Sequence, residues 1–263
     1  MVGLFSDQVR LLAVIVGCAA LWSVESLAPL YLQANRFRRA RPNIVLAVIL
    51  IVTNLALSFA TAGVATFAAQ HDLGILLLVK MPLWLATLFG IAALDLFTYI
   101  AHVLLHKSGI GWRFHRIHHS DNQVNVTTAF RQHPGETLWR ILWQILATVL
   151  FGIPLWMLAI YLSISTLNAQ LEHANIRVFE PVDRALRLLF VTPNMHKVHH
   201  SRRQFQTDTN YSNILSVWDR MFGTYTAGVD FDQLSYGLDG FDQEDQQTWR
   251  ALLKTPFAAS LSS

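Results

Sequence analysis

The chain is 263 residues long, with 53% hydrophobic and 14% charged residues and a mean hydropathy of +0.36. An ordinary soluble domain carries about 25% charged residues, so this composition predicts a protein that uses lipid as part of its solvent. The single cysteine, Cys18, excludes a disulfide scaffold and any cysteine-ligated zinc or iron–sulfur site. The formal net charge is +3, and no glycine-rich phosphate loop is present.

Four regions are long and apolar enough for membrane-spanning helices, which need about 20 residues each. In chain order they cover residues 9–32, 43–69, 81–106 and 138–171. The first region lacks a strong basic start, and Trp22 and Glu25 stand where a signal peptide would need small residues, so we expect a retained helix. The fourth is long enough for two short spans, and Pro154 near its middle predicts a tight hairpin. We therefore predict an all-α fold built as a multi-pass transmembrane helical bundle.

The connection between the first two regions sets the predicted orientation. Four arginines lie in residues 35–41, and the positive-inside rule places such a loop in the cytoplasm. This loop explains the positive charge better than a nucleic-acid site does, and we expect no nucleic-acid partner. Counting spans from it puts residues 102–137, and everything after about residue 172, in the cytoplasm. We expect a multi-pass integral protein of a bacterial inner membrane or of the endoplasmic reticulum.

Ten of the eleven histidines fall on this predicted cytoplasmic side. The exception, His71, lies in the short loop on the other side, and we interpret it as a satisfied core or interfacial histidine without a metal-binding role. The ten are His102, His106, His115, His118, His119, His133, His173, His196, His199 and His200. A single site built from separated segments requires such a one-sided distribution.

Eight of these histidines form three clusters with the spacing of metal ligands. His102 and His106 are four residues apart and share one helix face. The pattern His-x2-His-His occurs twice, at residues 115–119 and again at residues 196–200. Eight imidazoles exceed what one tetrahedral zinc ion uses and suit two metal ions, placed in a helical cap on the cytoplasmic face. The alternative is a pH-sensing or merely solvated basic surface.

Two isolated histidines have less certain roles. His173 directly follows the predicted hairpin, and we favour a ninth metal ligand over a role in orienting other ligands. His133 precedes Pro134, where a ligand, an orienting residue or a loop residue fits equally well. Thr192 is a suitable helix N-cap and Pro193 suits the first turn, so the last cluster is predicted to lie on a short helix.

Asp95 and Tyr99 lie on the same predicted helix face as His102 and His106. A carboxylate inside a membrane span is expensive and marks a functional residue by default. Asp95 is too far along the axis to bond His102, but it can reach Tyr99 or a histidine from another segment. We therefore predict that Asp95 and Tyr99 orient metal-bound imidazoles. The alternative is an Asp–Tyr pair that only holds helices together.

These motifs, taken in order, resemble the fatty acid hydroxylase/sterol desaturase superfamily of membrane-bound di-iron oxygenases. The resemblance covers about residues 91–226. It rests on Asp95-x3-Tyr99-x2-His102-x3-His106, His115-Arg116-Ile117-His118-His119-Ser120, Asn125-x-Thr127 with Arg131-x-His133-Pro134-x-Glu136, His173-Ala174-Asn175, Pro193-x2-His196-x2-His199-His200-Ser201, Asn210-Tyr211 and Trp218-Asp219-Arg220-Met221-Phe222-Gly223-Thr224. Order and spacing together are specific, whereas no single motif is.

The resemblance implies a function and a division of the chain. It implies two iron ions held by histidines, dioxygen as co-substrate, and hydroxylation or desaturation of a fatty acyl, sterol or related lipid-like substrate. Electrons would come from a separate donor, a ferredoxin or a small cytochrome with its reductase. We expect membrane-anchor helices in 1–90, the catalytic domain with its hairpin at about 138–172 in 91–226, and a polar tail in 227–263. Residues 218–224 are interpreted as mainly structural.

Two other classes of function remain open. A membrane zinc hydrolase usually carries a His-Glu-x2-His helix, and that motif is absent here. A metal-ion transporter places its ligands along the spans near the membrane midplane. In this chain the histidines lie at the ends of the predicted spans and beyond them, which argues against transport.

Overall fold

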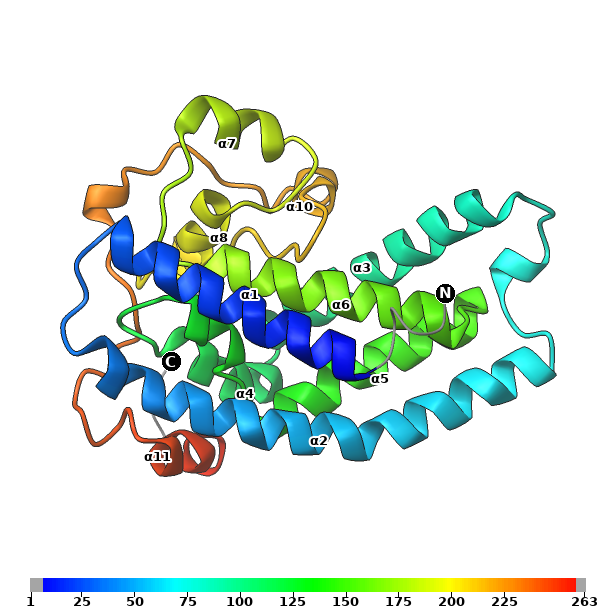
Figure 1. Ribbon diagram of the computed structural model, residues 1–263, viewed down its shortest axis with the longest axis horizontal. Helices are drawn as coiled ribbons and strands as arrows, with labels where there is room; N and C mark the ends of the chain where they lie inside the picture. Colours follow the sequence, from blue (N-terminus) through cyan, green and yellow to red (C-terminus); the bar gives the residue numbers. More distant parts are fainter. Residues whose placement is uncertain (1–6, 259–263) are drawn as a thin grey trace.

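A computed structural model describes residues 7–258, and the described chain folds into helices without a β-strand. Residues 1–6, at the start of the predicted anchor, and 259–263, at the end of the predicted tail, lie outside the described residues. Five long helices run along the long axis of the molecule, and short helices gather at one end of it (Figure 1). The all-α prediction is confirmed for this part of the chain.

The long helices form an elongated bundle that carries the short ones. The long helices are α1 (Asp7–Leu27), α2 (Arg36–Gln70), α3 (Leu83–Lys107), α5 (Pro134–Phe151) and α6 (Leu155–His173). The short helices are α4 (Gly109–His119), α7 (Glu180–Leu186), α8 (Pro193–His199), α9 (Gln204–Thr207), α10 (Val217–Met221) and α11 (Trp249–Lys254). Single 3₁₀ turns are η2 (Ile75–Leu77), η3 (Val126–Phe130), η4 (Phe231–Gln233) and η5 (Thr255–Phe257).

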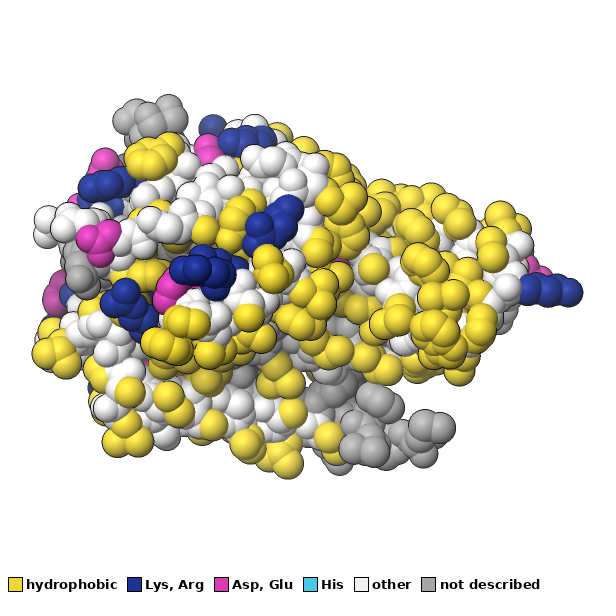
Figure 2. All heavy atoms as spheres, turned by 90° about the horizontal axis from the view of Figure 1, so that it is seen from above, with side chains coloured by type: hydrophobic (Ala, Val, Ile, Leu, Met, Phe, Trp, Pro, Cys, Tyr) yellow, Lys and Arg dark blue, Asp and Glu magenta, His cyan; other side chains and the backbone are white. Residues whose placement is uncertain are grey.

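Two described helices are long and apolar enough to cross a membrane, the segments Arg36–Leu77 and Leu83–Lys107. Along α2 the side chains of Val48, Val52, Leu55 and Phe59 are all more than half exposed, so one whole face of this helix packs against nothing in the chain. Apolar side chains also cover most of the visible surface toward the end where α2 and α3 are connected, with a few charged side chains at its tip, while most visible charged side chains lie at the other end (Figure 2). This surface is typical of contact with lipid.

Two predicted boundaries are wrong. The first helix ends at Leu27 rather than near residue 32, because Pro29 disfavours helical backbone in the residue before it. The arginine-rich segment is not a loop, since α2 begins at Arg36 and includes it in its first two turns. Arginine is a good helix former, and the apolar run that follows continues the same helix.

The predicted hairpin at Pro154 is present as a turn between α5 and α6. Gly152 ends α5 in a left-handed conformation with φ +68°, and Pro154 directly precedes α6. The turn packs on the loop after α2, since a side chain at Gly152 would come 2.7 Å from the carbonyl oxygen of Leu73. Ile153 is fully buried there with Met157.

The polar C-terminal segment packs onto the bundle. Phe241 and Leu252 are buried in one apolar cluster with Leu46 of α2 and Ile117 of α4. The Arg116 guanidinium donates to the carbonyl oxygen of Thr255 at 2.8 Å. These contacts cover the side of α4 opposite its histidines, so the segment supports the helix that carries one of the clusters.

Candidate metal centre

The clustered histidines and His173 lie at the C-terminal ends of four helices. These helix termini come together on one side of the bundle. His102 and His106 lie at the end of α3, the second cluster ends α4, and His173 ends α6. The last cluster lies on α8 and on the residue that follows it. Thr192 caps α8 by accepting from the Met195 backbone N–H at 3.2 Å, which confirms the predicted start of this helix.

The structure sorts the nine predicted ligands into two groups. In each group, one ring nitrogen per residue lies within 4.8 Å of those of all other members, and every member is buried. The first histidine group is His102, His106, His115, His119 and His199, and the second histidine group is His118, His173, His196 and His200. Each His-x2-His-His motif thus contributes to both groups.

The tautomers of two rings in the first histidine group fit a set of metal-ligand donors. His102 Nδ1 lies 2.7 Å from the Tyr211 carbonyl oxygen, and His199 Nδ1 lies 2.7 Å from that of Thr209. A carbonyl only accepts, so both rings carry their proton on Nδ1 and present a lone pair at Nε2. These two Nε2 atoms are 3.2 Å apart. Two lone pairs at this distance repel each other unless a cation lies between them.

The second histidine group has the same arrangement around one ring. His173 Nδ1 donates to the Ala169 carbonyl oxygen at 2.6 Å, so its Nε2 carries a lone pair. That Nε2 lies 3.1 Å from His118 Nε2, 3.1 Å from His196 Nε2 and 3.0 Å from His200 Nε2. Both groups therefore fit a transition-metal ion with several nitrogen ligands.

Burial keeps these rings in the form that binds metal. It lowers the pKa of His118, His119 and His199 well below the usual value for histidine, and the neighbouring imidazoles lower it further. The rings are consequently neutral at pH 7. Neutral imidazole is the metal-binding form of histidine.

Three carboxylates beside the ligands had no predicted role. Glu136 lies 3.0 Å from His115 Nδ1, Asp208 lies 3.4 Å from His106 Nδ1, and Glu172 lies 3.8 Å from His196 Nδ1. Carboxylates at such positions orient metal-binding imidazoles, and Glu136 is the nearest of the three, whereas Glu172 lies beyond hydrogen-bond distance. Glu172 directly precedes His173 at the end of a predicted span, and that position was the one signal in the sequence that pointed to it.

Asp95 makes different contacts from those predicted. Its buried carboxylate accepts from the backbone N–H of Ile214 at 3.1 Å and of Leu215 at 2.9 Å, and from Trp218 Nε1 at 2.9 Å. Tyr99 instead shares a hydrogen bond with Thr224 Oγ1 at 2.9 Å. Within residues 7–258, neither side chain hydrogen bonds to a histidine. Asp95 therefore ties α3 to the chain around α10, and no hydrogen bond joins it to Tyr99, as the alternative Asp–Tyr pair would require.

His133 lies outside both histidine groups. It caps α5, with Nδ1 accepting from the Gly135 backbone N–H at 2.9 Å. Its Nε2 lies 3.3 Å from the Leu253 carbonyl oxygen. Of its three predicted roles, these contacts match that of a loop residue.

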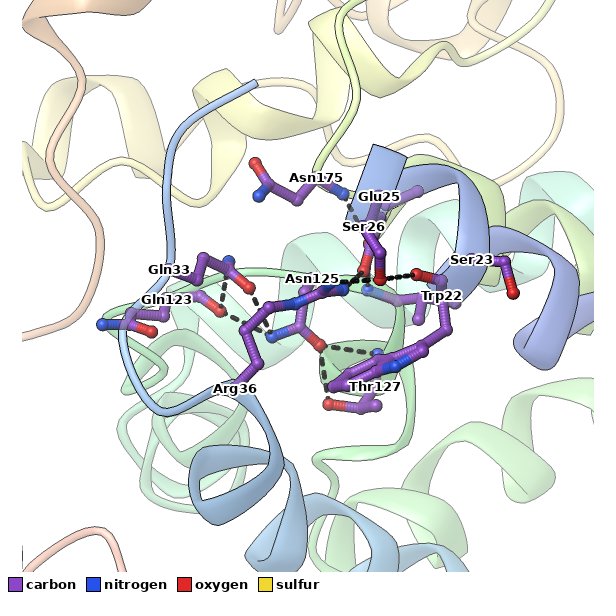
Figure 3. Close-up of polar contacts among 12 residues, drawn as sticks. Trp22, Ser23, Glu25, Ser26, Gln33, Arg36, Gln123, Asn125, Thr127 and Asn175 are labelled. Atoms are coloured by element: carbon purple, nitrogen blue, oxygen red, sulfur yellow. Dashed lines mark hydrogen bonds and ion pairs between the residues drawn. The ribbon is translucent and has the colours of Figure 1, made fainter. Parts of the chain in front are cut away.

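The first helix is tied to the site by a buried carboxylate (Figure 3). Glu25 Oε1 accepts from the backbone N–H of Val126 at 2.7 Å and of Asn175 at 2.6 Å. Its Oε2 pairs with the Arg36 guanidinium at 2.7 Å. Asn175 follows the ligand His173 by two residues. The end of α1 is therefore anchored next to the second histidine group.

A cavity of about 770 Å³ leads from the histidines into the bundle. Its walls come from α1, α2, α5 and α6, and His102, His118, His173 and His196 face it at one end. Its size lies within the range of small-molecule sites, which is roughly 300–1,000 Å³. Four of the histidines thus line a space large enough for a small-molecule ligand.

Fold and site together define a helical protein with an extensive apolar surface and two buried histidine groups that could hold metal ions. Residues 87–224, more than half of the chain, match the profile of the fatty acid hydroxylase family. The chain belongs to this family.

Its relatives include lipid-oxidising enzymes. Alkylglycerol monooxygenase of Danio rerio is 33% identical over 156 residues, which are 59% of this chain and 32% of the relative. Ornithine lipid hydroxylase OlsE of Rhizobium tropici is 32% identical over 150 residues, 56% of this chain and 43% of the relative. The matches therefore span less than half of either relative. No solved structure gives a significant match.

Proposed function

We propose that the protein is a membrane-bound di-iron oxygenase that hydroxylates or desaturates a C–H bond of a lipid-like substrate. One observation carries this proposal: two groups of neutral imidazole nitrogens converge at the end of a cavity with largely apolar walls. Family membership and the hydroxylase and monooxygenase relatives support the same class of reaction. Iron and the fatty acyl, sterol or related substrate follow from the family resemblance.

In this proposal each histidine group holds one iron ion, and the two irons, when bound, supply the dioxygen chemistry. The chain's own residues hold the ligands in place. Carbonyl oxygens of Ala169, Thr209 and Tyr211 keep three rings in one tautomer. Glu136, from α5, does the same for His115. The apolar walls of α1 and α2 exclude water and hold a hydrocarbon chain in front of the histidines.

The proposal also includes a position in the cell and a partner. The histidine site lies on the cytoplasmic face of a bacterial inner membrane or of the endoplasmic reticulum, with five spans counted from the arginine-rich segment. A separate ferredoxin, or a small cytochrome with its reductase, supplies electrons there. A substrate with a long hydrocarbon chain enters the cavity sideways from the lipid.

Metal analysis of the purified chain tests this function. We expect about two irons per chain, whereas one zinc without iron would support the hydrolase alternative and contradict the proposal. His118→Ala and His199→Ala each remove one lone pair from a different group, so both variants should lose iron and product formation. His71→Ala is the matched control, because His71 is exposed and outside both groups. Isotopic dioxygen with lipid mass analysis then separates hydroxylation, which incorporates label, from desaturation.

A further inference from the structure

The cavity wall formed by α5 is largely polar, whereas the walls formed by α1 and α2 are largely apolar. Thr137, Arg140, Ile141 and Gln144 line the cavity and follow one face of α5 at helical spacing. Three of these four side chains are polar, within a hairpin expected to lie in the membrane. They lie within the first three turns of α5, at the end of the helix that meets the histidines.

Arg140 has donors left over for a ligand. It is the one lysine or arginine among the residues that line the cavity. Its Nε donates to Glu136 Oε1 at 2.8 Å. Within residues 7–258, Nη1 and Nη2 have no hydrogen-bond partner, although the side chain is only 20% exposed. A guanidinium has five N–H donors, so four of them remain unused.

The walls formed by α1 and α2 suit a hydrocarbon chain. Helix α1 lines the cavity from Leu11 to Trp22, a length of about 16 Å at the helical rise of about 1.5 Å per residue. Helix α2 adds Ile44, Leu50 and Ile51. The cavity thus has one long apolar side and one short polar side next to the histidines. This is the shape of a single-chain lipid with a polar head.

We propose that Arg140 binds an oxyanion, a phosphate or carboxylate, in the head of the lipid substrate, while the chain lies along α1 and α2. The inference rests on the proposed function, and it adds the substrate class. Paired Nη donors match the two oxygens of such a group and bind it in a bidentate manner. The acidic side chain lining the cavity, Glu172, is bonded by Asn168 and faces His196. Arg140 pairs with Glu136 through Nε only, so it is the cationic side chain in the lining with donors left for a negative head.

The head group then determines which carbon is oxidised. Arg140 lies one helical turn beyond Glu136, and Glu136 contacts the ligand His115. A head bound at Arg140 is held close to the histidines, so the carbons nearest the head come before the site. The far end of the chain lies along α1, away from the histidines.

Equilibrium binding to the metal-loaded full chain in neutral-lipid nanodiscs tests the assignment. The probes are palmitoylglycerol phosphate, palmitoylglycerol with the same chain and a neutral head, and inorganic phosphate alone. We expect the wild-type protein to bind the phosphate-headed lipid about tenfold more tightly than the neutral one, which corresponds to about 1.4 kcal/mol. Arg140→Gln should reduce this ratio to about one, and Arg140→Lys should leave an intermediate ratio.

Arg113→Gln is the matched control, because Arg113 is exposed on α4 and does not line the cavity, so its ratio should equal that of the wild type. An equal affinity of the wild type for both lipids would overturn the proposal, as would a full preference in Arg140→Gln. The proposal would also be overturned if inorganic phosphate alone displaced the phosphate-headed lipid at a concentration similar to that of the lipid. If Arg140→Gln does not fold, the proposal is tested by the ratio of the affinities for the two lipids in the wild type and in Arg140→Lys. Binding needs no turnover, so a failed oxygenase assignment appears separately in the iron and product measurements.

Discussion

Glu136 is a buried carboxylate shared between a metal ligand and a cavity residue. One oxygen lies 3.0 Å from His115 Nδ1 and accepts from Arg140 Nε at 2.8 Å. We expect Glu136→Gln to lower iron content or the rate of product formation by about 10–100-fold, as for other residues that support metal ligands. The reason is that a neutral amide neither holds the His115 proton on Nδ1 as strongly nor balances the Arg140 charge.

Iron per chain and labelled product, measured at equal protein concentration, check this prediction. Glu244→Gln is the control, since Glu244 is an exposed carboxylate that also pairs with an arginine, Arg38. Full iron content and full rate in Glu136→Gln would show that His115 needs no carboxylate.

Spacing alone was sufficient to predict eight of the nine histidines that the structure brings together, and His173 was added from its position after the hairpin, but their supporting residues were not predicted. The ligands recur at three and four residues, and that periodicity is local to a helix. The partners of Asp95 are backbone N–H groups 119 and 120 residues away, at Ile214 and Leu215. No local pattern encodes such a distance, so the contacts of Asp95, and those between Glu136 and His115, required the fold.

At the scale of elements, Gly152 holds the turn between α5 and α6 in a conformation that disfavours other residues. Its φ is +68°, and an added Cβ would lie 2.7 Å from the Leu73 carbonyl oxygen. We expect Gly152→Ala to lower the free energy of unfolding by about 1–2 kcal/mol from the left-handed backbone, with a further loss from the close contact. Thermal unfolding in detergent measures the effect.

Gly63→Ala provides a control of opposite sign. Gly63 lies inside α2, and an added Cβ meets no atom within 4 Å. Alanine is favoured over glycine in a helix by about 1 kcal/mol, so this variant should unfold at an equal or higher temperature. A lower midpoint in Gly63→Ala than in Gly152→Ala would contradict this account of the turn.

Helix boundaries were predicted correctly where a single residue fixes the local backbone conformation. Pro154 and Thr192 mark the ends that they were predicted to mark. The end of α1 was placed too late because hydropathy continues past Pro29, although helical backbone does not. Hydropathy reports burial in lipid or protein, whereas capping and proline report the backbone itself.

At the scale of the whole molecule, the proposed topology puts the loop after α2 on the side of the membrane opposite to the histidine site. The chain has one cysteine, so a Cys18→Ser background allows single-cysteine labelling. His71→Cys and Arg250→Cys each introduce one exposed thiol. In the proposed topology these two thiols lie on opposite sides of the membrane. We expect an impermeant maleimide to label His71→Cys in intact cells and Arg250→Cys only after the membrane is opened.

Labelling of both positions from the same side would contradict the five-span count. Permeabilised cells provide the control, since both thiols must react there. The result is independent of iron and of activity.

The apolar composition predicted a lipid-facing surface, and α2 exposes such a face. The role of the C-terminal segment was not predictable, because Phe241 and Leu252 pack against Leu46 and Ile117, more than 120 residues earlier. A polar segment with a few apolar residues has no periodicity to indicate a core. Only the folded chain shows that this segment supports α4.

The backbone carbonyls that hold His102, His173 and His199 have a consequence for mutational change. A carbonyl belongs to every amino acid, so replacing the side chain of Ala169, Thr209 or Tyr211 leaves the acceptor in place. Point mutations at these partners therefore leave the hydrogen-bond acceptors of the three histidines in place. His106, His115 and His196 instead face carboxylate side chains, which a point mutation can remove. Genetic drift and engineering can therefore retune the site most readily through Glu136, Glu172 and Asp208.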